Sequence, residues 1–141
     1  ALVDNKVSQK DDLIKLVLLE VNCGSTRNPL VKVILNYKGK EIEKSNSGNG
    51  PVDAIFNSIN DLIENNAKLE LFLINAITKG TDAQAEVSVR LKENDISVSG
   101  TASDTDTMVA SANAYIIALN KLIMKRKKRN IDLNLSTKKI N

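Results

Sequence analysis

The 141-residue sequence contains no histidine, no tryptophan and a single cysteine, Cys23. Without histidine, neither a Cys–His nor a Ser–His catalytic pair can form, and one cysteine cannot supply the ligand set of a zinc site. A single cysteine also excludes an intrachain disulfide, and we expect Cys23 to be an ordinary half-buried residue of a cytoplasmic protein. The composition therefore predicts no catalysis by this chain alone, no metal and no cofactor.

Aromatic residues are also scarce, at 3% of the chain, whereas hydrophobic residues make up 42%. The core must therefore be built from leucine, isoleucine, valine and alanine. No apolar run reaches the roughly 18 residues that a membrane-spanning helix needs, so no membrane partner is expected. No signal peptide is visible, and the start at Ala1 suggests a piece of a longer protein.

Charge is unevenly distributed along the chain, although the net charge is only +3. Residues 125–141 hold seven basic residues and one acidic residue, which leaves 13 basic and 16 acidic residues in positions 1–124. The basic run at 125–129 could contact nucleic acid or an anionic membrane. Because no aromatic side chains interleave with it, a solvated basic tail beyond a helix is the favoured interpretation.

Hydrophobic periodicity indicates the same order of elements twice. Strands are predicted at 13–22, 30–37 and 41–46, with a helix at about 51–65. The second set comprises strands at 69–78, 83–91 and 96–100 and a helix at about 105–127. The prediction is an α+β fold with a duplicated βββα unit, in which two small antiparallel sheets pack with two helices. The repeats span about 13–66 and 69–124, after a frayed lead-in at 1–12 and before a tail at 125–141.

Two helix starts are candidate functional features. In the first, Gly48 and Gly50 could take positive φ or allow close approach, and Pro51 suits the first helical position. The free N–H groups of that turn could bind a small carboxylate, or the segment could be a turn and nothing more. In the second, Asp104 and Asp106 could share a cation, but helix capping is the favoured interpretation.

Three segments in this order resemble a known family: GNGPVDA at 48–54, AITKGTDAQAEV at 76–87, and GTASDTD at 100–106 with its following ASA and ALN. They are similar to the C-terminal regulatory domain of 2-isopropylmalate synthase, which also occurs in citramalate synthase. The resemblance covers roughly residues 13–124. It implies the duplicated βββα fold and a domain that binds an end-product amino acid at a dimer interface.

The resemblance further implies a separate catalytic barrel, absent here, that condenses acetyl-CoA with a 2-oxo acid. The expected partners are thus a branched-chain amino acid, a second copy of the chain and that barrel, with no nucleic acid. Matching the motifs residue by residue implies these ligand contacts: Gly48, Gly50, Val52, Asp53, Leu69, Phe72, Ala76, Ala83, Ala102, Asp104 and Asp106.

Taken singly, Leu69, Phe72, Ala76 and Ala83 fit the core of a strand face better, but together with the flanking motifs they favour a ligand pocket. Two positions depart from the family pattern, because Phe72 stands where tyrosine is frequent and Ala102 where glycine is usual. The small side chains of Ala76 and Ala83 favour leucine, which branches at Cγ, over isoleucine. An isoleucine-sensing domain of citramalate synthase is the alternative, and a basic-tailed nucleic-acid-binding module is a remoter one.

Overall fold

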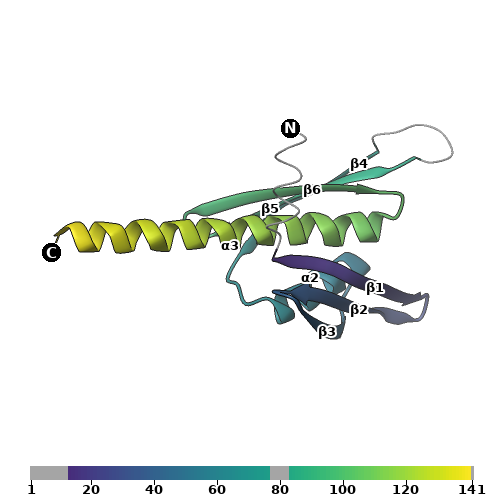
Figure 1. Ribbon diagram of the computed structural model, residues 1–141. Coiled ribbons are helices and arrows are strands. Elements are labelled where there is room, and N and C mark those ends of the chain that lie inside the picture. Colours follow the sequence, from purple (N-terminus) through teal and green to yellow (C-terminus); the bar gives the residue numbers. More distant parts are fainter. Residues whose placement is uncertain (1–12, 77–82, 141) are drawn as a thin grey trace.

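The computed structural model describes residues 13–76 and 83–140, which form two βββα units in succession (Figure 1). The first unit comprises β1 (Ile14–Gly24), β2 (Arg27–Tyr37), β3 (Lys40–Ser47) and α2 (Pro51–Leu62). The second comprises β4 (Lys68–Ala76), β5 (Ala85–Glu93), β6 (Ile96–Asp104) and α3 (Thr107–Ile140). Each unit contains one antiparallel sheet, with strand order β1-β2-β3 or β4-β5-β6. The predicted α+β architecture is confirmed, while the expected lead-in at 1–12 lies outside the described residues.

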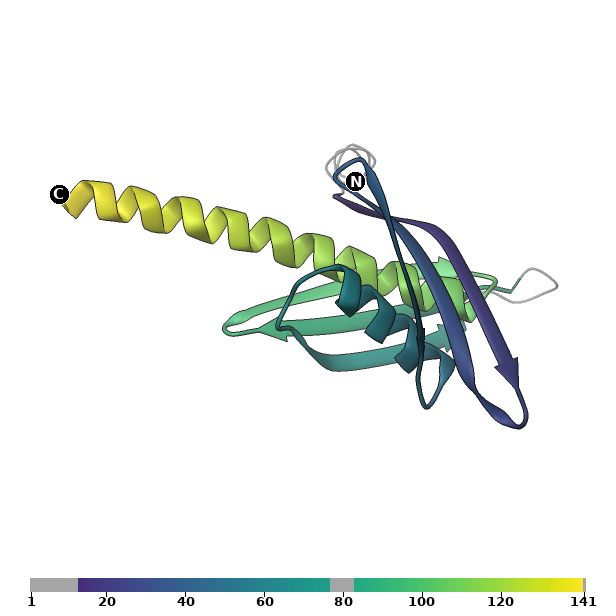
Figure 2. The ribbon, with the colours of Figure 1, turned by 90° about the horizontal axis from the view of Figure 1, so that it is seen from below.

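The two units share one aliphatic core. Helix α2 packs on β2 and β3, helix α3 packs on β5 and β6, and α3 also contacts α2 and β1. In Figure 1, α3 lies between the β4-β5-β6 sheet and the first unit, and Figure 2 shows the same arrangement from below. The inward side chains of the central strands are fully buried: Val31, Val33, Leu35, Val87, Val89 and Leu91. Helix α3 is therefore the layer that both sheets enclose.

Two contacts of α3 explain how closely the layers approach. The side chain of Asn120 accepts a hydrogen bond from the Ile14 N–H (2.9 Å) and donates one to the Ile14 carbonyl (3.0 Å). This buried amide thereby substitutes for a strand partner on the free edge of β1. On the other side of α3, a Cβ at Gly100 would lie 2.2 Å from the carbonyl oxygen of Ala114. Only glycine at this position allows β6 to approach the helix so closely.

Helix α3 is longer than the sequence analysis predicts. It runs to Ile140 and does not end near Lys127, so the expected basic tail is the last part of a continuous helix. The sequence after Gly100 contains neither glycine nor proline to end it. The helix is also tied to the β5–β6 turn, because Arg126 pairs with Glu93 and Arg129 pairs with Asp95. Its C-terminal part extends beyond both sheets (Figure 1).

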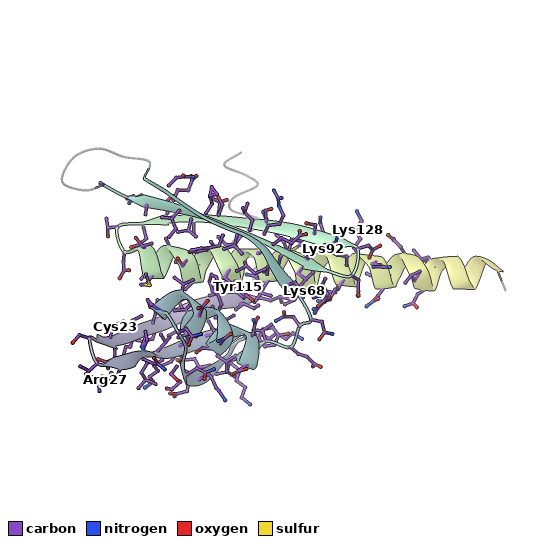
Figure 3. All side chains as sticks on the ribbon, turned by 180° about the vertical axis from the view of Figure 1, so that it is seen from behind. Cys23, Arg27, Lys68, Lys92, Tyr115 and Lys128 are labelled. Atoms are coloured by element: carbon purple, nitrogen blue, oxygen red, sulfur yellow. The ribbon has the colours of Figure 1, made fainter. Side chains whose placement is uncertain are left out.

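Four smaller expectations are wrong. The connection between the strands predicted at 13–22 and 30–37 is only a two-residue turn, and Cys23, expected to be half-buried, is exposed near one end of the β1–β2 hairpin (Figure 3). The last strand of the second unit continues to Asp104. Among the described glycines, positive φ occurs at Gly39, whereas Gly50 is extended with φ −142°.

Within the described residues, α3 is the one helix long and apolar enough to cross a membrane, because an 18-residue window within Thr107–Leu135 has a mean hydropathy of 1.3. Of that window, 56% is buried inside the protein. Its apolar side chains pack against the two sheets, which is typical of a core helix.

Candidate functional site

The start of α2 is open. Pro51 occupies the first turn, Gly50 is the N-cap, and no side chain caps the helix with a hydrogen bond. The first intrahelical bond runs from the Ala54 N–H to the Gly50 carbonyl at 3.0 Å, so the N–H groups of Val52 and Asp53 precede it. Unpaired N–H groups at a helix start attract anions.

Close packing explains the glycine at position 48. A Cβ there would lie 2.9 Å from the backbone nitrogen of Ala54, so any larger residue would push the turn away from the helix. A Cβ at Gly50 would lie 4.0 Å from Oδ2 of Asp53, which is an ordinary contact distance. The close approach expected at these glycines is therefore confirmed for Gly48.

The start of α3 is closed by its own acidic residues. The Asp106 carboxylate accepts a hydrogen bond from the Met108 N–H at 2.8 Å, and the Asp104 carboxylate accepts one from the Asp106 N–H at 2.8 Å. This geometry agrees with the capping interpretation. Among residues 13–76 and 83–140, no group of three or more acidic or cysteine side chains is arranged to hold a metal ion.

Three of the four aromatic side chains meet where β4, α2 and α3 come together. The Phe72 ring lies edge-on to the Phe56 ring, with centroids 5.7 Å apart, and Phe56 stacks on Tyr115 at 4.3 Å. The Tyr115 hydroxyl donates a 2.6 Å hydrogen bond to Asn60 on α2. Burial raises the pKa of Tyr115, and the Asn60 hydrogen bond partly opposes that shift, so the phenol stays neutral. Figure 3 shows Tyr115 between α3 and the first unit.

This cluster joins Phe72, a predicted site residue, to three residues that the sequence analysis missed: Phe56, Asn60 and Tyr115. A signal for Phe56 and Tyr115 did exist, because aromatics are scarce in this chain and each one stands out.

The other predicted site residues lie around this junction at different places. Leu69 is on β4 and 47% exposed, Ala76 pairs with Ala85 at the end of β4, and Ala83 is exposed just before β5. Ala102 is on β6 and pairs with Val87. Since β5 separates β4 from β6, Ala102 is two strand spacings, about 10 Å, from β4.

The structure therefore brings the predicted residues together only in part. Helices α2 and α3 begin at the same end of the domain, as Figures 1 and 2 show. Phe72 meets α2 through Phe56, but Ala102 lines a different cavity, between β1, β6 and α3. Within one chain, the candidate site is thus an open surface made by the α2 start and β4.

A buried ion pair lies at the opposite end of the second unit. Arg126 donates to both carboxylate oxygens of Glu93, one of them at 2.6 Å, and the N–H of Asn66 in the linker donates to the same carboxylate at 2.8 Å. These bonds, the one from Arg126 above all, hold the pKa of Glu93 below its ordinary value, although burial opposes the shift. The Glu93 carboxylate thereby joins the linker, β5 and α3.

Comparisons with known proteins agree with this architecture. Residues 1–123 match the family described as the LeuA allosteric (dimerisation) domain. A 2-isopropylmalate synthase of Rhodopseudomonas palustris (strain BisA53) is 51% identical over 128 residues, which cover 91% of this chain and 25% of that protein. The 2-isopropylmalate synthase of Methylobacterium nodulans is 47% identical over 123 residues, 87% of this chain and 24% of the relative. The chain thus spans about a quarter of the length of these relatives.

Proposed function

Because the chain belongs to the family of LeuA allosteric (dimerisation) domains, we propose that it senses a branched-chain amino acid, with leucine preferred. Binding gives feedback inhibition of a 2-isopropylmalate synthase-like acyltransferase, whose catalytic barrel is the domain's partner. The chain itself is the regulatory part and not the catalytic part of such an enzyme. In this proposal the domain needs no cofactor of its own and works in the cytoplasm.

The observation that carries the proposal is the difference between the two helix starts. Helix α3 is capped by Asp106, whereas α2 has no side-chain cap and presents the N–H groups of Val52 and Asp53. A ligand carboxylate supplies the acceptor that the α2 start lacks.

The remaining groups of an amino acid also find suitable chemistry nearby. An α-ammonium group needs a carboxylate, and Asp53 is in the first turn of α2, with Asp104 and Asp106 at the start of α3. A branched aliphatic side chain needs an apolar wall, which β4 offers through Leu69 and Phe72. Burial of such a side chain contributes about 1.5–3 kcal/mol.

A symmetric homodimer completes the proposed site. The candidate surface is open in one chain, and β4 is an edge strand on which Leu69, Leu73 and Ile74 are 42–47% exposed. A two-fold axis would bring the candidate surfaces of the two chains together, and these surfaces would enclose the effector. Light scattering at micromolar concentration, with and without leucine, should give the mass of a dimer. A monomer under both conditions would contradict this part of the proposal.

Thermal unfolding with single ligands tests the effector. Leucine at 100 times its Kd should stabilise the domain by about 2.7 kcal/mol. Leucinamide acts as a matched control, because it lacks the carboxylate that the α2 start would bind. We expect it to stabilise much less than leucine. If leucine, isoleucine and valine all leave the melting temperature unchanged, the sensing function is refuted.

Calorimetry shows whether leucine or isoleucine binds more tightly. One misplaced methyl group in an apolar pocket costs about 1–3 kcal/mol, or about 10–200-fold in affinity. Ala76→Ile fills depth that a Cγ-branched side chain would use, so it should weaken leucine more than isoleucine. Tighter binding of isoleucine by the wild type would instead assign the domain to a citramalate synthase.

A nucleic-acid-binding module is the second candidate. The observation in its favour is that the basic run at 125–129 is part of helix α3. We regard it as less favoured, since no aromatic residue accompanies the run. Salt-dependent binding of a duplex at physiological ionic strength would support it.

A further inference from the structure

The duplication creates two equivalent junctions between the units. At one junction, β4 of the second unit meets α2 of the first through the Phe72–Phe56 contact. At the other, β1 of the first unit meets α3 of the second through the Asn120 hydrogen bonds to Ile14. The proposed effector site uses the first junction.

A cavity of about 360 Å³ lies at the second junction, between β1, β6 and α3. This volume falls within the range of small-molecule pockets, about 300–1,000 Å³. Among the apolar side chains that line it are Ile14 and Ile116, which are almost fully buried, and Leu16 and Ile117, which are partly exposed. The lining is thus aliphatic, with access to solvent.

The polar groups at this cavity favour an anion over a cation. Lys15 is the one charged residue that lines it, and no acidic residue does. Neither the Lys15 ammonium nor the Asn113 side-chain amide has a partner among the described residues. Asn120, by contrast, is occupied by its bonds to Ile14. The unpaired groups can donate hydrogen bonds to an anion, but the lining holds no carboxylate to form an ion pair with an ammonium group.

We propose that the β1–α3 junction is a second ligand site, which takes a short branched aliphatic carboxylate that lacks an α-ammonium group. The carboxylate accepts hydrogen bonds from Lys15 and Asn113, and the alkyl chain lies among Leu16, Ile116 and Ile117. This site differs from the proposed effector site in its elements and in its ligand class, and it does not depend on leucine sensing.

Amide chemical shifts of the intact ¹⁵N-labelled chain test the proposal, with 4-methylpentanoate titrated in the presence of saturating leucine. We expect saturable shifts at Lys15, Ala102 and Asn113, and weaker binding of the neutral 4-methylpentanamide. Leu16→Phe enlarges a side chain that lines the cavity, and it should weaken binding at least about tenfold. The control Val17→Phe places the same ring on the next residue, which is 50% exposed, and should bind as wild type does.

A separate variant tests the contribution of the Lys15 charge to binding. Lys15→Met should weaken 4-methylpentanoate about two- to fivefold, the worth of an exposed ion pair, whereas the control Lys44→Met should have no effect. Should Leu16→Phe fail to fold, Ala102→Val narrows the same cavity from β6. Absence of shifts at the three residues in wild type, or equal losses in Leu16→Phe and Val17→Phe, would overturn the proposal. Shifts there without any response to leucine would uphold it while refuting the sensing function.

Discussion

Loss of one partner of the Arg126–Glu93 pair should destabilise the second unit more than loss of one partner of its exposed ion pair. The Glu93 side chain is 9% exposed and that of Arg126 is 30% exposed. Removal of one partner leaves the other charge buried, which costs about 3–5 kcal/mol at a fully buried pair. Because Arg126 is partly solvated, we expect Arg126→Met to lower the free energy of unfolding by about 2–3 kcal/mol. In a domain of this size, the melting temperature should fall by about 6–12 °C.

The chain provides a matched control one helical turn further on. Arg129 forms the same kind of pair with Asp95, but their side chains are 48% and 72% exposed. Surface ion pairs contribute little, so Arg129→Met should change the melting temperature much less than Arg126→Met. Thermal unfolding followed by circular dichroism measures both variants. Equal shifts in the two variants would refute the argument from burial.

Acid pH gives an independent readout of the same pair. Arg126 holds the pKa of Glu93 below its ordinary value in the folded state. The resulting stability is present above the ordinary glutamate pKa, about 4.3, and is lost as the pH falls through the lowered folded-state value. Wild type and Arg126→Met should therefore differ most near neutral pH and converge on acidification. A difference that stays constant down to pH 3 would show that lost packing, and not charge, explains the variant.

Three further predictions concern packing and chain length. Gly100→Ala would place a Cβ 2.2 Å from the carbonyl of Ala114, so it should destabilise the domain by about 3 kcal/mol or more in denaturant unfolding. Tyr115→Phe keeps the ring but removes the 2.6 Å hydrogen bond to Asn60, so it should lower the free energy of unfolding by about 1 kcal/mol. An unchanged free energy in the same assay would show that this hydrogen bond does not stabilise the domain. A chain that ends at Met124 should still bind leucine in calorimetry. Its melting temperature should be lower than that of wild type, because it lacks the Arg126–Glu93 ion pair. Loss of leucine binding by a folded truncated chain would show that the last helical turns belong to the site.

The sequence determined the architecture because the pattern of each strand, turn and helix is local and the order of these elements occurs twice. Alternating strand patterns, glycine turns and two amphipathic helices recur at offsets of 54–56 residues, which predicts two βββα units without knowledge of any long-range contact. The cap formed by Asp106 and the open start at Pro51 are likewise readable, since each depends on residues within one turn of the helix. The family motifs depend on the same local segments.

What the tertiary structure decided depends on contacts between distant residues. Helix α3 continues past Lys127, where its Arg126 and Arg129 pair with carboxylates more than 30 positions away, and no local pattern predicts such pairs. The packing of the units also placed Ala102 beside the cavity between β1, β6 and α3, away from Phe72, although the motifs grouped them. Whether a junction between the units is closed depends on which side chains face each other across it, so only the folded chain shows the aromatic contact at the β4–α2 junction and the cavity at the β1–α3 junction.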